Sequence, residues 1–305
     1  MKKQLLGLAL SVFLPLTASA AADGSANDPL QVMLVPADGG TASGTRADFE
    51  PVFNAVTRST GLHFDIKVGQ SYGTVVEAMC QGQADIAFHG AVSYVQANRR
   101  GCANLLAVGV EDGESVYYAG MFTQKDSGIE SLDDLHGRSV SFGDINSASS
   151  FTFQMAMLLE AGMEPVQDLG RIRMTGSHAN SISALAEGQV DVASLSFSSF
   201  EKAVRQGVIN PAAIDVVERS VPIPNPPLAL RPGLPDAMKS KLREAFHTVH
   251  KADGVTPEMI RGYGGKQVDR FNAEFPEEKY QIAGNKLDMV SDELKGEILR
   301  AAGKR

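Results

Sequence analysis

The chain has 305 residues, of which 43% are hydrophobic, and it carries a formal net charge of −8 with a pI of about 5.3. This acidic balance argues against nucleic-acid binding, which needs a basic surface, so we expect no nucleic-acid partner. A chain of this length usually forms more than one hydrophobic core, which suits a protein with two lobes.

The first residues have the pattern of a secretory signal peptide. Lys2 and Lys3 precede an apolar run over residues 5–16, and small residues follow up to Ala22. A basic start, a short apolar run and a small-residue end are typical of such peptides. The run is also shorter than the stretch of about 20 apolar residues that spans a bilayer. We therefore expect residues 1–22 to be a signal peptide and the mature protein to be a periplasmic monomer.

The first part of the mature chain alternates short apolar strands with helices. This alternation predicts an α/β fold with mainly parallel sheets that helices flank on both faces. In such sheets ligands bind beyond the carboxyl ends of the strands, often at a helix N-terminus. Strands are expected at 30–36, 63–68, 86–88 and 105–110, and helices at 49–60, 73–81 and 94–100.

The two cysteines of the chain, Cys80 and Cys102, both lie in this part. In an oxidising compartment such a pair is a candidate disulfide. Two inert thiols, or a thiol that binds a soft metalloid, are the alternatives. Two thiols alone do not complete a zinc site, and we expect no metal and no cofactor.

One segment of the chain occurs twice, at 76–87 and at 182–193. Each copy has the pattern of a helix, a Gly-Gln C-cap and a short buried strand with an aspartate at its start. The simplest interpretation is one copy in each of two lobes. We expect a signal peptide at 1–22, lobe 1 at 23–120 and 226–305, and lobe 2 at 121–225.

Two crossovers should connect these lobes. A long strand is expected at 117–123 where the chain leaves lobe 1. Residues 221–230 include four prolines, which exclude a helix and favour an extended return. The C-terminal part, with a clear helix at 239–250, is expected to pack back on lobe 1.

Hydroxyl side chains gather where a helix begins in lobe 2. Residues 144–150 follow an expected strand at 139–142 and include Ser147 and Ser149. A helix start has unpaired N–H groups and partial positive charge, so it can bind an anion without Lys or Arg. An ordinary N-cap is the alternative interpretation.

Three further side chains have suitable chemistry for an oxyanion site. His178 precedes the second copy of the repeat, and Tyr72 and Tyr94 each precede a helix of lobe 1. An imidazole or a phenol can donate a hydrogen bond to an oxyanion. Taken singly, each residue is equally compatible with a capping or core role.

Several segments together resemble the phosphonate/phosphite-binding proteins of bacterial ABC importers, which have the type II periplasmic binding protein fold. The resemblance implies that two tyrosines, a hydroxyl run and a histidine hold the tetrahedral head of the ligand between the lobes. The implied residues are Tyr72, Tyr94, Ser147, Ser149 and His178. The matching segments are 71–72, 87–94, 132–138, 146–150, 176–178 and 220–224.

The chain departs from that family at two positions. Ala148 stands where the family usually has Thr, and Ser196 stands about where it often has an Asp that accepts from an amine or a protonated oxygen. From Ser196 we expect phosphite or a simple alkylphosphonate to bind better than an aminoalkylphosphonate. A related branch senses arsenite through a cysteine, and Cys102 would take that role here.

The sequence therefore predicts a two-lobed α/β binding protein that delivers a small oxyanion to an ABC transporter permease. The alternative is a sensor for a metalloid oxyanion such as arsenite that signals through a membrane histidine kinase. An enzyme is not expected, because no Ser-His-Asp set, metal cluster or phosphate-binding loop is apparent.

Overall fold

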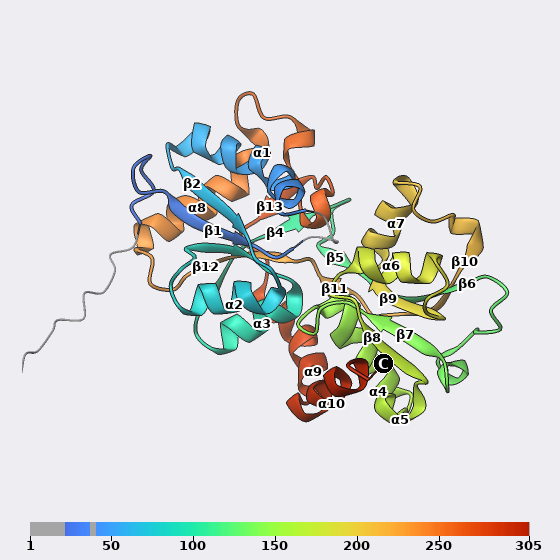
Figure 1. Cartoon of the computed structure of the whole chain (residues 1–305). Helices are drawn as coiled ribbons and strands as arrows, with labels where there is room; N and C mark the ends of the chain where they lie inside the picture. The colour runs from blue at the N-terminus through green and yellow to red at the C-terminus, as the bar shows by residue number, and fades with distance from the viewer. Residues whose placement is uncertain (1–21, 37–40, 305) are drawn as a thin grey trace, which may run out of the picture.

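The computed structural model describes residues 22–36 and 41–304. The expected signal peptide lies outside the described residues except for Ala22. The chain forms two α/β lobes that lie side by side, each with a sheet between layers of helices (Figure 1). This arrangement confirms the predicted fold class. Every helix in the described ranges is too short or too polar to cross a membrane.

The first lobe is built on a six-stranded sheet. Strands β1, β2 and β3 pair in parallel, whereas β12, which returns from the second lobe, runs antiparallel between β3 and β4. The strands in spatial order are β13 (Arg270–Asn272), β4 (Asn104–Val110), β12 (Pro227–Leu230), β3 (Ile86–Phe88), β1 (Leu30–Leu34) and β2 (Phe64–Val68).

The second lobe repeats this plan with a five-stranded sheet. Strands β7, β8 and β9 pair in parallel, and β6 and β10 extend the sheet antiparallel on one side. The strands in spatial order are β10 (Ile214–Arg219), β6 (Ala119–Gln124), β9 (Val192–Ser196), β7 (Ser139–Phe142) and β8 (Arg171–Met174).

The aspartate of each sequence repeat fixes the pairing of the central strands. Asp85 accepts a hydrogen bond from the backbone N of Gln31 in β1 at 2.9 Å, and Asp191 accepts one from Ser139 N in β7 at 2.7 Å. The orders β2-β1-β3 and β8-β7-β9 are therefore equivalent. The repeat marks the same helix and strand in each lobe.

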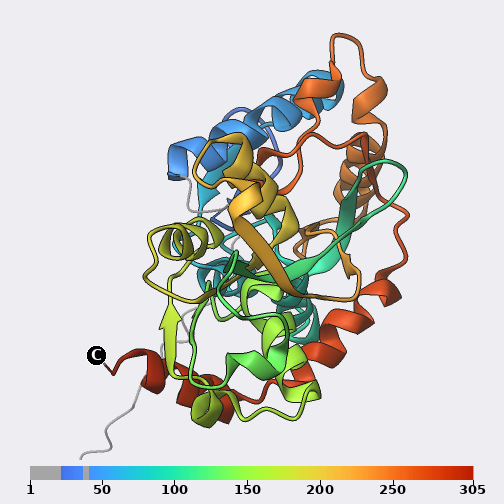
Figure 2. The ribbon, with the colours of Figure 1, turned by 90° about the vertical axis from the view of Figure 1, so that its right-hand side faces the viewer.

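Helices cover both faces of each sheet (Figures 1 and 2). Those of the first lobe are α1 (Ala42–Thr60), α2 (Tyr72–Cys80), α3 (Ala91–Arg99) and α8 (Asp236–Thr248). Those of the second lobe are α4 (Phe153–Glu160), α5 (Pro165–Asp168), α6 (His178–Ala186) and α7 (Phe197–Arg205).

The crossovers differ in detail from the prediction. The long strand expected at 117–123 is divided into β5 (Val116–Tyr117) and β6, with Tyr118 between them. Strand β5 pairs with β11 (Ile223–Pro224), so the outgoing and returning chains form a small two-stranded sheet between the lobes. The extended return predicted from the prolines is present in β11 and β12.

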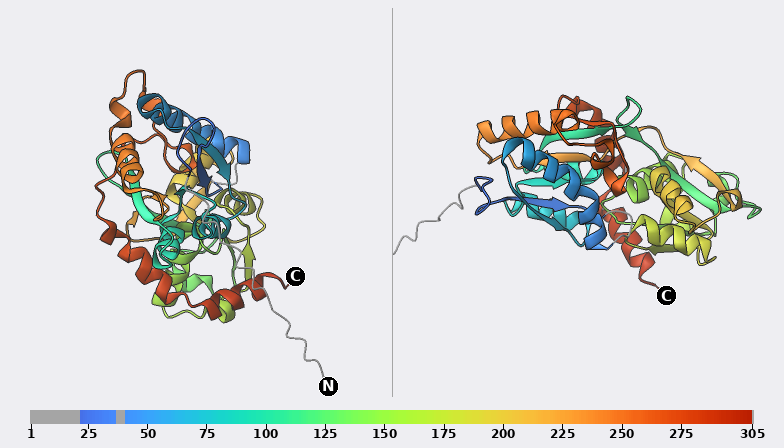
Figure 3. Two further views of the ribbon diagram at one scale, coloured as in Figure 1. Left: turned by 90° about the vertical axis from the view of Figure 1, so that its left-hand side faces the viewer. Right: turned by 90° about the horizontal axis from the view of Figure 1, so that it is seen from above.

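The C-terminal helices require a correction. Helix α9 (Gln281–Met289) contacts α3 of the first lobe and α4 of the second, and α10 (Asp292–Ala302) packs on β8 and α5. Figures 1 and 3 show this segment running beneath both lobes. Val290 and Ile298 are buried in the core of the second lobe, so the expected packing on lobe 1 does not hold for α10. The exact lobe boundaries stay a prediction.

The two cysteines lie at the C-terminal ends of α2 and α3. Cys80 ends α2 and Cys102 follows α3, and the two form a disulfide with a Cα–Cα distance of 4.7 Å. The bond ties together two helices whose N-termini both point toward the second lobe.

Candidate functional site

Helix α2 presents its N-terminus to the second lobe. Ser71 caps the helix through a reciprocal pair of bonds with Thr74, and Tyr72 is 4% exposed. The ring of Tyr72 lies against Gly90, where a Cβ atom would come within 2.9 Å of Cε1. A side chain at position 90 would therefore displace the tyrosine.

The hydroxyl run of the second lobe begins a π-helical turn, η2 (Ala148–Thr152), which leads into α4. Ser147 caps this turn by accepting from Ser150 N at 3.2 Å, and Ser147 and Ser149 are both buried. The hydroxyls of Ser150 and Thr152 are buried without a hydrogen-bond partner among the described residues. π-Turns are frequent at functional sites, and unpaired buried hydroxyls need an explanation.

The two lobes meet at this point. The carboxylate of Asp144 accepts from Tyr72 N at 3.3 Å, and the Asn146 amide oxygen accepts from Gln96 Nε2 at 3.1 Å. Burial raises the pKa of Asp144. The start of η2 is therefore placed directly opposite the start of α2.

His178 begins α6 next to the same region. Its Nδ1 accepts from the backbone N of Ser196 at 3.1 Å, so in the neutral ring Nε2 carries the proton and is the donor. A Cβ atom on Gly143 would lie 2.4 Å from Ser150 Oγ and 3.5 Å from the Ser177 carbonyl carbon. This close approach brings the α6 start beside η2.

Ser196 acts as an N-cap. Its hydroxyl oxygen accepts from Ser199 N at 3.1 Å and lies 2.7 Å from Ser199 Oγ. The side chain is therefore committed to the start of α7, and its backbone N orients His178.

Tyr94 is placed differently from the other predicted residues. Its hydroxyl donates to Glu277 at 2.5 Å, and its ring packs on Tyr280 at 4.9 Å. Burial and the neighbouring Glu277 carboxylate raise the pKa of Tyr94. The hydroxyl thus faces the C-terminal segment, whereas Tyr72, Ser147 and His178 converge between the lobes.

Tyr263 joins this group, although the sequence analysis did not select it. It begins the short turn η6 (Tyr263–Gly265), its hydroxyl lies 2.5 Å from that of Tyr72, and its ring stands 6.2 Å from that of His178. The only sequence signal is an aromatic residue inside a glycine-rich turn. Gly264 and Gly265 both have positive φ, so the turn needs these glycines.

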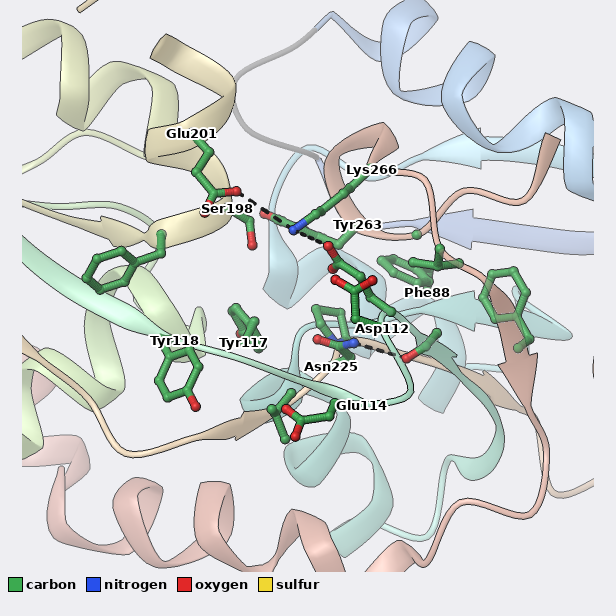
Figure 4. Close-up of a pocket in the computed structure, with 18 of the residues that line it drawn as sticks. Phe88, Asp112, Glu114, Tyr117, Tyr118, Ser198, Glu201, Asn225, Tyr263 and Lys266 are labelled. Atoms are coloured by element: carbon green, nitrogen blue, oxygen red, sulfur yellow. Dashed lines mark hydrogen bonds and ion pairs between the residues drawn. The ribbon is translucent and has the colours of Figure 1, made fainter. Parts of the chain in front are cut away.

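A cavity of about 420 Å³ lies beside this group, between the lobes and against the crossovers. Aromatic rings form much of its wall, and the guanidinium of Arg219 stacks 3.7 Å over the ring of Tyr118. Figure 4 shows the labelled aromatic side chains around this space. The rings that line it are Phe88, Tyr117, Tyr118, Phe197, Tyr263 and Phe271.

Acidic groups outnumber basic groups around this central cavity. Lys266 pairs with Glu111 at 2.7 Å and lies 3.8 Å from Glu201 of the second lobe (Figure 4). Asp112 and Glu114 add negative charge at the rim, where both are exposed. The cavity can therefore take an organic group with positive charge, and Tyr263 connects it to the group at Tyr72 and His178.

Comparison with known proteins identifies the family. The family model for the phosphonate-specific periplasmic substrate-binding protein of ABC transporters matches residues 40–274. The chain belongs to this family. Its members are substrate-binding transport proteins rather than enzymes, and their location is the periplasm.

Individual relatives agree with this assignment. The phosphate-import protein PhnD of Mycolicibacterium smegmatis is 26% identical over 72% of this chain and 71% of its own length. A binding protein of a Pseudomonas aeruginosa phosphonate transporter has a TM-score of 0.72 and 22% identity, covering 90% of this chain and 99% of its own. PhnD1 of Prochlorococcus marinus, solved with methylphosphonate, has a TM-score of 0.71 and 16% identity, covering 85% and 98%.

In this periplasmic binding protein the crossover tyrosines were missed for a clear reason. Tyr117 and Tyr118 lie in what sequence analysis treated as a continuous strand, whose residues were expected to be structural. The division of that strand into β5 and β6 instead places both at the central cavity. The available signal was an aromatic pair at the start of a predicted crossover.

Proposed function

We propose that the protein captures a small tetrahedral oxyanion of the phosphonate or phosphite type between its lobes and delivers it to an ABC permease. The observation that carries this proposal is the convergence of Tyr72, Ser147 and His178 with the start of η2. These are neutral donors, and a helix start adds partial positive charge. Such a site binds an anion by oriented dipoles.

The central cavity suggests which substituent the oxyanion carries. Phosphite would leave a space of about 420 Å³ unused, whereas an organic group would contact its aromatic wall. Asp112, Glu114 and Glu201 supply negative charge that Ser196 lacks. We therefore expect an aminoalkylphosphonate to bind no more weakly than methylphosphonate, which reverses the order expected from Ser196 alone.

The arsenite-sensor alternative is less well supported. Arsenite capture by cysteine needs a thiolate, and the sulfur of Cys102 is bonded to that of Cys80. We therefore favour the importer role over signalling to a histidine kinase.

Calorimetry on the mature protein tests the proposal with phosphite, methylphosphonate, aminoethylphosphonate, phosphate, sulfate and arsenite. We expect tight binding of a phosphorus oxyanion. Tyr72→Phe should weaken it, because the hydroxyl between the lobes is lost. Tyr94→Phe should leave affinity unchanged, because that hydroxyl bonds Glu277. Failure of every phosphorus ligand to bind would refute the proposal, and a larger effect of Tyr94→Phe would restore Tyr94 to the site.

A further inference from the structure

A second cavity, of about 490 Å³, lies between the start of α1 and the end of α7. Figure 1 shows the two helices on opposite sides of the division between the lobes, α1 in blue and α7 in gold. We call this space the basic cavity, because four cationic side chains line it against the single carboxylate of Asp48. The cations are Lys202 and Arg205 of the second lobe and Arg261 and Lys266 of the first.

The helix end that faces the basic cavity adds to its positive charge. Helix α1 has 19 residues, Thr41 caps it, and its first turn contains no acidic residue. The N-terminus of a helix carries about half a positive charge, which an acidic side chain usually offsets in the first turn. Here that charge is directed toward further cations.

An unsatisfied hydroxyl marks the wall of the same cavity. Thr45 lines it and is 2% exposed, and its Oγ1 is buried without a hydrogen-bond partner among the described residues. Leaving a buried polar group unpaired costs free energy, so such atoms are rare in folded proteins. A ligand that accepts hydrogen bonds would remove this cost.

The four cations differ in whether they already have hydrogen-bond or ion-pair partners within the protein. Lys266 pairs with Glu111, Lys202 donates to Gly264 O at 3.1 Å, and Arg261 donates to the carbonyls of Glu258 and Gly265. Arg205 forms no hydrogen bond or ion pair with any residue that the structure describes. A cation in the last turn of α7 is stabilised by the helix dipole. That interaction does not explain why the C-terminal end of α7 faces the N-terminus of α1.

Contact between the lobes therefore brings like charges together. The start of α1 belongs to the first lobe and carries the positive end of its dipole, and the end of α7 belongs to the second lobe and carries the cations Lys202 and Arg205, which outweigh the partial negative charge of that helix end. Repulsion of this kind opposes closure unless an anion lies between the two sides.

We propose that the basic cavity is a second anion site that takes a divalent tetrahedral oxyanion, such as phosphate, and bridges the lobes. The anion accepts from Thr45 and Arg205 and neutralises the α1 N-terminus. It is separate from the group at Tyr72, Ser147 and His178. Because Lys266 lines both cavities, the anion is either free in solution or a second anionic group of the ligand in the central cavity.

The test is calorimetric titration of the mature protein with inorganic phosphate in an oxyanion-free buffer. A Ser147→Ala background weakens the first site and isolates the second. In that background Arg205→Gln should lower phosphate affinity about ten-fold or more, since a charge-assisted bond is lost, and Thr45→Val should lower it several-fold. Arg300→Gln, which changes a cation in the last turn of α10, is the matched control.

A second arm distinguishes the two sources of the anion. If the anion is free, saturating methylphosphonate leaves phosphate affinity unchanged. If it is part of the ligand, phosphonoacetate loses affinity in both Ser147→Ala and Arg205→Gln, and phosphate competes with it. Both results support the site.

Equal phosphate affinity in the Arg205→Gln and Thr45→Val variants and their parent would overturn the inference, as would an equal loss in Arg300→Gln. Loss of phosphonate binding with phosphate binding retained would refute only the proposed function.

Discussion

The hydroxyl of Ser147 combines a structural and a binding role. It caps η2 by accepting from Ser150 N, and it lies at the point where the lobes meet. Ser147→Ala should lower the free energy of unfolding by about 1 kcal/mol and oxyanion affinity about 10- to 150-fold. Ser291→Ala removes the equivalent cap of α10 and should affect only stability. Urea unfolding and calorimetry on both variants separate the roles, and equal affinities would assign Ser147 to capping alone.

His89 makes the stability of the protein depend on pH. It is fully buried after β3, neither ring nitrogen has a hydrogen-bond partner in the described structure, and burial lowers its pKa from 6.5 to about 3. Above pH 6.5 the ring is neutral in both the folded and the unfolded state, so it does not change the free energy of unfolding. Between pH 6.5 and about 3 only the unfolded state takes up the proton, and stability falls as pH falls.

From pH 7 to pH 5 the His89 contribution should amount to roughly 2 kcal/mol of lost stability. His89→Leu should abolish this part of the acid sensitivity, whereas His63→Gln at an exposed position should not. Urea unfolding at the two pH values measures the difference. Parallel pH profiles for wild type and His89→Leu would mean that His89 is protonated in the folded protein.

At the scale of elements, the disulfide holds α2 and α3 in fixed relation. The bond closes a loop of 22 residues. For a loop of this length, loss of the cross-link should lower the free energy of unfolding by roughly 3 kcal/mol. The double variant Cys80→Ser/Cys102→Ser should therefore unfold at lower urea concentration but bind the oxyanion with similar affinity. Wild type in reductant provides the comparison. Loss of arsenite binding in the variant, together with free thiols in native protein, would instead support the sensor alternative.

Elements with a local sequence pattern were predicted well. The repeat with Asp85 and Asp191 identified equivalent helices and strands, because the same burial and the same capping glycines recur in each lobe. The same pattern placed Tyr72 and His178 just before the two repeat helices, and the structure has them as the first residues of α2 and α6. The sites that were missed depend on tertiary contacts: Tyr263 lies in a turn without periodicity, and α10 packs on the second lobe through the few apolar residues around Ile298.

Tyr94 shows how the orientation of a hydroxyl escapes a local sequence pattern. The sequence placed Tyr72 and Tyr94 alike, each just before a helix of lobe 1, but Tyr72 begins α2 whereas Tyr94 lies within α3, and their hydroxyls point to different surroundings. Orientation depends on Glu277 and Tyr280, which lie far along the chain, so no local pattern could reveal it.

At the scale of the whole molecule, the lobes touch through a few polar contacts and through the apolar side chains of Ala148 and Phe153, which belong to the hydrophobic cluster of the first lobe. Gln96 donates to Asn146, Asp144 accepts from Tyr72 N, and Lys202 donates to Gly264 O across the division. The hydrophobic clusters of the two sheets remain largely separate. Polar contacts of this kind can break without unfolding either lobe, which suits a hinge motion at β5 and β11.

The bond between Gln96 and Asn146 allows a direct test of this motion. Asn146→Ala removes the hydrogen bond to Gln96, which exists only when the lobes are together, so the closed state should lose about 0.5–1.5 kcal/mol. Oxyanion affinity should therefore fall about two- to ten-fold. The variant also loses a side-chain hydrogen bond to Asp144 within the second lobe, so the free energy of unfolding should fall by a similar small amount. Calorimetry measures the affinity, and small-angle scattering with and without ligand measures the compactness.

Asn285→Ala is the matched control, because its amide oxygen accepts from Gln281 within α9 and crosses no lobe division. It should leave both affinity and compactness unchanged. If the two variants behave alike, the contact at Asn146 does not report on closure. If Asn146→Ala weakens binding and makes the ligand-bound protein less compact, binding free energy is coupled to lobe closure through this contact, as a hinged binding protein requires.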